Sequence, residues 1–123
     1  MTDAESLMTD KYSRRITDVR VALNSACNLR CIYCHHEGEA VNGCVRSEKS
    51  KAMSADEISE ILSLLVTLGV RTVKLTGGEP TLREDLTDII RSVPEGMEIS
   101  MTTNGTRLKY LAGELKKAGL SRV

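Results

Sequence analysis

The sequence predicts an α/β fold in which parallel strands alternate with helices. Short stretches of alternating apolar and polar residues are each followed by a longer stretch whose apolar residues recur every three or four positions. The resulting order is β-α-β-α-β-α, and a further strand begins at the end of the chain. Such alternation favours right-handed crossovers and a parallel sheet. The chain has no Phe and no Trp, so its core must be aliphatic.

Four segments have the pattern of strands. Residues 17–24, 71–76 and 97–104 alternate apolar with polar side chains, and residues 120–123 read as the start of a fourth strand. Three of these segments are followed by a helical pattern, so the connections are long enough to cross over the sheet. The strands are therefore expected to run parallel to one another.

Helical periodicity covers residues 53–69, 81–93 and 106–119. The first helix is expected to begin with a capping box formed by Ser54 and Glu57. In the second helix, Thr81 and Glu84 have the same spacing and predict a second capping box. A glycine follows the first and third helices, as is typical of helix ends.

The chain stops as its fourth strand begins, which predicts the front part of a larger barrel. Residues 1–15 are expected to form a mobile arm, and residues 16–123 the first βα units of a truncated domain. Lys plus Arg and Asp plus Glu balance at 17 each, so no nucleic acid or acidic membrane is expected as a partner. The N-terminus is polar, and no apolar run reaches the roughly 20 residues of a membrane span. A cytoplasmic protein with reduced cysteines is therefore expected.

Each strand carries polar side chains on one of its two faces. Parallel strands that are covered on both faces normally read as continuous apolar runs, and these do not. The polar positions are Arg20 and Asn24, then Thr72, Lys74 and Thr76, then Glu98, Ser100, Thr102 and Asn104. This face is either exposed to solvent or the lining of a polar lumen. In a lumen, Arg20 and Lys74 would supply positive charge for a carboxylate or a phosphate.

Three of the four cysteines form a cluster directly after the first strand. Cys27, Cys31 and Cys34 have the spacing C-x3-C-x2-C. Three thiolates would hold a [4Fe–4S] cluster and leave one iron open for a further ligand, whereas four would complete an electron carrier. Cys44 lies ten residues further on, and we interpret it as an ordinary thiol.

Three other interpretations of the cluster stay open on spacing alone. Structural zinc would need a fourth ligand, from Cys44, His35 or His36. The letters "CIYCH" also match a covalent haem attachment site, although that chemistry suits an exported chain. A thioredoxin-like redox pair, formed by Cys31 and Cys34, would leave the first cysteine without a role.

The cysteine spacing resembles the signature of the radical S-adenosylmethionine (radical SAM) enzymes. The segment "TGGEP" (76–80) resembles that family's GGE motif at the end of its second strand. The resemblance implies the N-terminal portion of a partial (βα)6 TIM-like barrel and a cluster whose open iron is chelated by SAM. It also implies reductive cleavage of SAM to a 5′-deoxyadenosyl radical. SAM contacts are implied at Tyr33, Gly77, Gly78 and Glu79. The two glycines lack a Cβ, so we expect a ligand to approach the main chain closely there.

More of the chain is similar to one branch, the GTP 3′,8-cyclases of molybdenum cofactor biosynthesis. The segments that carry the similarity are "RRITDVRVAL", "CNLRCIYC", "LGVRTVKLTGGEPTLREDL" and "MTTNGTRLKYLAGELKKAGLSRV". GTP contacts are implied at Arg20, at Lys74, where Arg is frequent in the family, and at Thr102. All three positions fall on the polar face that was found from alternation alone.

This branch implies conversion of GTP to (8S)-3′,8-cyclo-7,8-dihydroguanosine 5′-triphosphate, with hydrogen taken from C3′ of the ribose. It further implies a second [4Fe–4S] cluster in a C-terminal part, a reductant of the flavodoxin or ferredoxin type, and a possible homodimer. Two alternatives remain at this stage. One is another radical SAM enzyme that modifies a peptide or tailors haem, and the other is a zinc-stabilised binding module.

Overall fold

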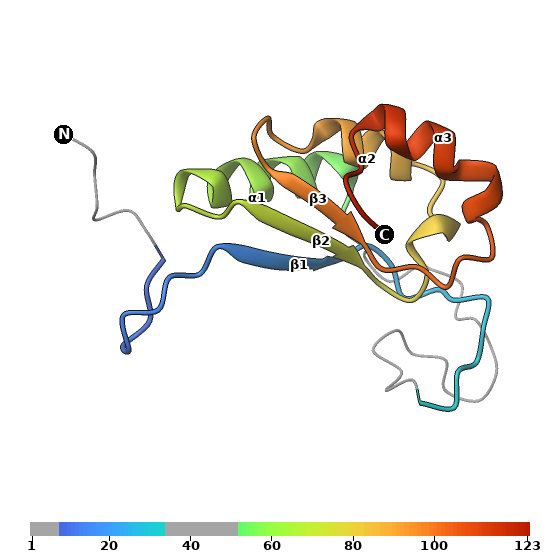
Figure 1. The fold of residues 1–123 in the computed structure, drawn as a ribbon, viewed down its shortest axis with the longest axis horizontal. Helices are drawn as coiled ribbons and strands as arrows, with labels where there is room; N and C mark the ends of the chain where they lie inside the picture. The colour runs from blue at the N-terminus through green and yellow to red at the C-terminus, as the bar shows by residue number, and fades with distance from the viewer. Residues whose placement is uncertain (1–7, 34–51) are drawn as a thin grey trace.

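A computed structural model describes residues 8–33 and 52–123, and it confirms the parallel α/β architecture. The sheet contains β1 (Asp18–Ala22), β2 (Thr72–Thr76) and β3 (Glu98–Met101), in the order β1-β2-β3 (Figure 1). Both strand pairs are parallel. Each strand is a little shorter than its predicted segment.

Three helices, α1 (Ala55–Thr67), α2 (Leu86–Ser92) and α3 (Leu108–Ala118), cover one face of this sheet (Figure 1). The predicted capping box of α1 is confirmed: the Ser54 N–H donates to Glu57 at 2.8 Å, and the Glu57 N–H donates to the Ser54 hydroxyl at 3.2 Å. The aliphatic core lies between the helices and the sheet. Its fully buried members include Leu23, Ile58, Leu62, Val73, Leu75, Ile89, Ile90, Met101 and Leu115.

The prediction of the second helix, over residues 81–93, was wrong in its first half. A 3-10 helix, η3 (Pro80–Leu82), precedes α2, which begins only at Leu86. Thr81 does not cap α2, whose N-cap residue is Asp85; the N–H and the hydroxyl of Thr81 both donate to the Glu79 carboxylate. The chain is extended at Arg83, with φ −81° and ψ 121°, so helical geometry is interrupted there.

The register of the strands confirms the predicted division into two faces. Arg20 pairs with Lys74, and Lys74 pairs with Ser100, so these three residues form one row across the sheet. Val73 and Leu75 alternate with them on the helix-covered face and are fully buried. The predicted start of a fourth strand is also present, as a parallel bridge between Ser100 and Arg122.

The described part of the N-terminal segment is attached to the domain by hydrogen bonds. Met8 donates its N–H to the carbonyl of Leu68, and its own carbonyl accepts from Ile16 at 2.9 Å. Between them the chain makes a tight turn around Asp10. The N–H of Arg14 donates to the Asp10 carboxylate and, with the Arg14 guanidinium, lowers the pKa of that carboxyl group.

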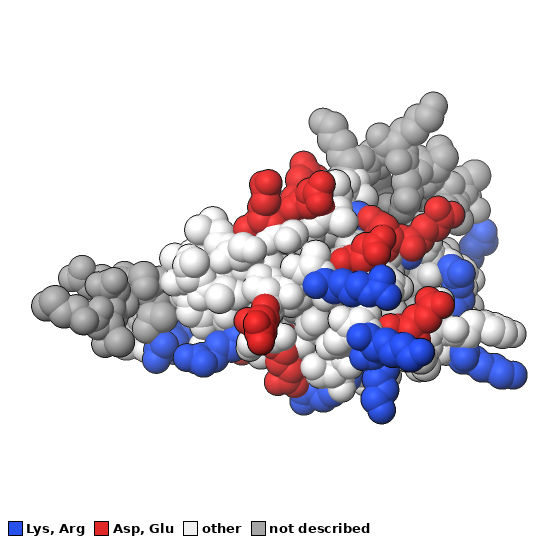
Figure 2. Space-filling model, turned by 90° about the horizontal axis from the view of Figure 1, so that it is seen from above, with Lys and Arg blue, Asp and Glu red and all other residues white. Residues whose placement is uncertain are grey.

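Charged side chains of both signs intermingle on the helix-covered face (Figure 2). This mixture agrees with the equal numbers of acidic and basic residues in the whole chain. Among the residues that the structure describes, no helix has the length and apolarity that a membrane crossing requires.

Candidate functional site

The candidate site lies where the three parallel strands end. The cysteine segment leaves β1, the "TGGEP" turn leaves β2, and residues 102–107 leave β3 at the same edge (Figure 1). Ligands of α/β barrels are usually bound at this carboxyl edge, because the strand-following loops converge there. The fold thus brings together three segments that the sequence singled out separately.

The chain between β1 and the first cysteine continues the pairing of β1 with β2 beyond the sheet. Leu23 donates its N–H to Thr76 at 2.8 Å, and Gly78 donates its N–H to the carbonyl of Asn24 at 2.9 Å. Next, the N–H of Glu79 donates to the carbonyl of Ala26 at 2.7 Å. The main chain is therefore fixed up to the residue that precedes the first cysteine.

Both glycines of the turn are needed for this close approach. A Cβ at Gly78 would stand 2.2 Å from the carbonyl oxygen of Ala26. At Gly77, where φ is +151°, a Cβ would stand 2.4 Å from Oδ1 of Asn24. Approach of a ligand was the reason predicted for these glycines, but the nearest neighbours in the structure are residues of the chain's own cysteine segment.

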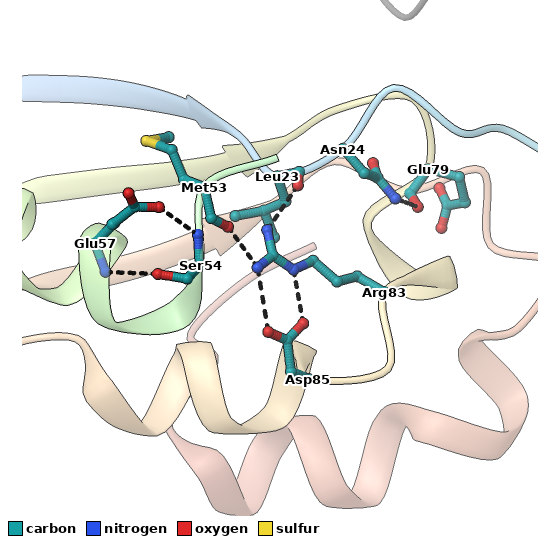
Figure 3. Close-up of polar contacts among 8 residues, drawn as sticks. All are labelled: Leu23, Asn24, Met53, Ser54, Glu57, Glu79, Arg83 and Asp85. Atoms are coloured by element: carbon teal, nitrogen blue, oxygen red, sulfur yellow. Dashed lines mark hydrogen bonds and ion pairs between the residues drawn. The ribbon is translucent and has the colours of Figure 1, made fainter. Parts of the chain in front are cut away.

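Glu79 holds the turns after β2 and β3 together. Its side chain is only 1 % exposed, and one carboxylate oxygen accepts from Thr81 and, at 2.7 Å, from the hydroxyl of Thr103. The other oxygen accepts from the N–H of Asn104 at 2.8 Å. The carbonyl of Glu79 accepts from the Asn24 amide at 2.9 Å (Figure 3). The predicted SAM contact of Glu79 stays a prediction, and the carboxylate is already engaged by internal donors.

Another pair of amides joins the cysteine segment to the loop after β3. The Asn104 amide donates to Oδ1 of Asn28 at 2.7 Å, and the Asn28 amide donates to the hydroxyl of Thr106 at 2.9 Å. Asn28 directly follows the first cysteine. The position of that cysteine is thus linked to the loop that carries Thr102.

Two of the three predicted cluster ligands lie in the described part of the chain. Cys27 and Cys31 are half-buried and form no disulfide there. Cys34, His35, His36 and Cys44 fall outside the described residues. Within residues 8–33 and 52–123 no group of three potential metal ligands occurs. Tyr33, a predicted SAM contact, is 80% exposed.

The described residues fit an iron–sulfur cluster in chemistry and in placement. Cys27 and Cys31 are partly accessible thiols on a segment whose start is fixed by main-chain hydrogen bonds. Thiolates are the ligands that iron–sulfur clusters select. The buried Oδ1 of Asn24, beside the turn, has no hydrogen-bond partner among the described residues.

The polar face of the sheet contains a hollow of about 260 Å³. Arg20 and Lys74 both line it, on the polar face predicted from their alternation, and Asp18, Ser100 and Arg122 are also in the lining. Arg122 was not among the predicted site residues, and it forms a 2.6 Å ion pair with Glu98. Thr102 does not line the hollow; its N–H donates to Leu75, and it lies towards the carboxyl edge.

Comparison with known proteins gives one family match. The model of the radical SAM superfamily matches residues 21–123. Several curated archaeal relatives carry the name "Probable GTP 3′,8-cyclase". The relative from Archaeoglobus fulgidus is 50% identical over 117 residues, which are 95% of this chain and 37% of that protein.

Two further relatives with that name give similar values. The protein from Sulfolobus acidocaldarius is 51% identical over 118 residues, covering 94% of this chain and 36% of the relative. The protein from Pyrococcus abyssi is 44% identical over 118 residues, covering 95% and 36%. The chain therefore spans about a third of the length of the curated relatives it matches.

Proposed function

The chain belongs to the radical SAM superfamily, and from that premise we propose that it is the N-terminal part of a GTP 3′,8-cyclase. The three relatives described above, which carry this name, are 44% to 51% identical to it. The proposed reaction converts GTP to (8S)-3′,8-cyclo-7,8-dihydroguanosine 5′-triphosphate, the first step of molybdenum cofactor biosynthesis.

One observation carries the proposal. The segment that bears Cys27 and Cys31 is bonded to the glycine turn at the carboxyl edge, and the sheet beside it presents Arg20 and Lys74 on its polar face. A site for a thiolate-bound cofactor and a site for an anion are therefore built from the same three strands. A zinc-stabilised binding module gives no reason for two neighbouring cations on the polar face of the same sheet.

Cys27, Cys31 and Cys34 would hold the cluster, and Tyr33 together with the turn of Gly77 and Gly78 would contact SAM. When bound, the cluster and SAM supply the radical that takes hydrogen from C3′ of the ribose, so that C3′ can bond to C8 of guanine. The chain's own residues orient the reactants. The bonds of the Asn24 and Ala26 carbonyls to the turn set the distance between the cysteine segment and the SAM contacts.

Arg20 and Lys74 would bind the triphosphate of GTP. They are direct neighbours across β1 and β2, so their charges act on one anion. The side chain of Lys74 is half-buried, while Arg20 is exposed. A partly desolvated cation binds phosphate more strongly than one in open water. Thr102, nearer the carboxyl edge, would contact the part of GTP that faces SAM.

The remaining partners are proposed on the same basis. A second [4Fe–4S] cluster would be held by a C-terminal part, as the resemblance implies. Electrons would come from a reductant of the flavodoxin or ferredoxin type in the cytoplasm. A homodimer is compatible with the proposal, and the described residues carry no observation that requires one.

The decisive experiment is an anaerobic reaction of the parent protein, at the length of its relatives, with SAM, GTP and dithionite. Chromatography would quantify 5′-deoxyadenosine and the cyclised nucleotide separately. We expect both products, in amounts that depend on GTP. Formation of 5′-deoxyadenosine with no cyclised nucleotide would indicate another radical SAM reaction. Purified protein that binds zinc, with no iron or sulfide after anaerobic reconstitution, would overturn the proposal altogether.

A further inference from the structure

Arg83 connects the two ends of the segment that carries all four cysteines. Its Nη1 donates to the carbonyl of Leu23 at 2.7 Å, and its Nη2 donates to the carbonyl of Met53 at 2.6 Å (Figure 3). Leu23 immediately precedes the cysteine segment, and Met53 closely follows it. These partners lie 60 and 30 residues away from Arg83 in the sequence.

Asp85 holds the guanidinium in this orientation. Nε of Arg83 donates to Oδ1 of Asp85 at 2.6 Å, and Nη2 donates to Oδ2 at 3.1 Å (Figure 3). All three guanidinium nitrogens are therefore used. The Arg83 side chain is only 12% exposed. If it were removed, the carbonyls of Leu23 and Met53 would lose this donor. A lysine has one nitrogen and cannot reproduce this planar fork.

The position of Arg83 couples this contact to the glycine turn. Arg83 directly follows η3 and is separated from Glu79 only by the residues of that short helix. The turn is bonded to Asn24 and Ala26 on its other side. The start of the cysteine segment is thus held both by the glycine turn and by Arg83. Arg83 also holds the chain at Met53, where it rejoins the domain.

We propose that Arg83 is a positioning residue that fixes the chain at Leu23 and at Met53, and so holds the described start of the cysteine segment, which carries Cys27 and Cys31, in place before a cluster binds. Fixing the points where a segment leaves and rejoins the domain restricts the conformations of its ends in advance. A cofactor that binds it then has less ordering to impose. The link to cluster binding rests on the proposed function, whereas the fixing of the two ends does not.

The test begins with the full chain before iron is added. Amide hydrogen exchange would be measured by mass spectrometry for wild type, Arg83→Lys and Asp85→Asn. Arg91→Lys is the matched control, because Arg91 pairs with Asp88 on the exposed surface of α2 at 3.7 Å. In Arg83→Lys, we expect exchange to rise roughly threefold or more in peptides that contain residues 22–28 and 52–56, since local bonds govern local opening. Peptides from β3 and α3 should change by less than about twofold.

The pattern of exchange decides between positioning and general stability. Unchanged exchange at the two ends, or an equal rise throughout β3 and α3, would overturn the proposal. Asp85→Asn keeps Arg83 and should show a smaller rise at the same two ends. If Arg83→Lys does not fold, the Asp85→Asn pattern decides alone: a rise confined to the ends supports positioning, and any other pattern contradicts it.

A second measurement separates this inference from the proposed function. After anaerobic reconstitution to equal iron content, iron loss to a chelator should be several-fold faster in Arg83→Lys than in Arg91→Lys. Equal rates would contradict the coupling of Arg83 to the cluster. If wild type takes up no iron while the exchange pattern is as expected, the proposed function fails and the fixing of the two ends stands.

Discussion

Gly78 and Ala26 approach each other so closely that a Cβ on Gly78 would stand 2.2 Å from the carbonyl oxygen of Ala26. This contact places the turn after β2 directly against the residue before the first cysteine. The main-chain bond from Glu79 to Ala26, at 2.7 Å, lies next to it. The close spacing between the cysteine segment and the turn is thus possible because residue 78 has no side chain.

Gly78→Ala is expected to destabilise the chain and to displace the cysteine segment. An added methyl at this distance forces main-chain movement, which typically costs about 1–3 kcal/mol. Urea unfolding followed by circular dichroism would measure the loss. Gly113→Ala is the matched control, because nothing lies within 4 Å of a Cβ at that helical position. That control should gain about 0.5–1 kcal/mol from helix propensity. Equal stability of the two variants would contradict the close contact.

Much of this arrangement could be predicted from the sequence, because it follows local periodicity. Alternation along the strands correctly placed Arg20 and Lys74 on a polar face, and Ser54 and Glu57 correctly marked the start of α1. The split between η3 and α2 could not be predicted in this way. It depends on Arg83, whose partners are distant in sequence, and local spacing alone gives no sign of such contacts.

The reason for the glycines in the turn also needed the structure. Sequence reasoning attributed Gly77 and Gly78 to ligand approach, since glycine is permissive in turns. The structure shows that Asn24 and Ala26 occupy the space first. A contact between two loops depends on how the strands before them pair. The sequence alone does not give the distance between such loops. The third cysteine and Cys44 lie outside the described residues, so the ligand set stays a prediction.

Glu79→Gln is expected to destabilise the chain by about 1–3 kcal/mol, because a buried donor then loses its acceptor. Four donors from Thr81, Thr103 and Asn104 converge on the carboxylate, and an amide has only one acceptor oxygen. Urea unfolding would again give the difference. Glu84→Gln, at an exposed position, should stay within about 0.5 kcal/mol of wild type. A Glu79→Gln variant as stable as this control would show that the converging hydrogen bonds contribute little.

Single replacement of Cys27, Cys31 or Cys34 by Ala is expected to abolish iron uptake. Wild type should take up about four iron atoms into this site on anaerobic reconstitution. Cys44→Ala should retain that iron, because three thiolates suffice for a cluster with one open position. Iron and sulfide analysis measures the outcome, and circular dichroism before reconstitution checks that each variant is folded. Loss of the cluster in Cys44→Ala would show that the ligand set has four members.

Arg20→Ala and Lys74→Ala are expected to weaken GTP binding by the parent protein. Both cations line the hollow on the polar face and are neighbours across two strands. A charge-assisted contact to phosphate typically contributes about 1.5–3 kcal/mol, which corresponds to roughly ten- to 150-fold in affinity. Calorimetric titration with GTP would measure this change. Affinity for SAM should remain nearly constant, because the SAM contacts are predicted on Tyr33 and the glycine turn.

Lys117→Ala provides the control for these two variants. Lys117 is exposed near the end of α3, on the side of the sheet opposite to the hollow, so its removal changes net charge by the same amount without touching the proposed site. At physiological salt the Debye length is about 8 Å, so exposed charges that are farther apart than this interact only weakly. GTP affinity of Lys117→Ala should therefore equal that of wild type. If all three variants bind GTP equally well, the polar face is ordinary solvated surface, and the triphosphate must be bound elsewhere.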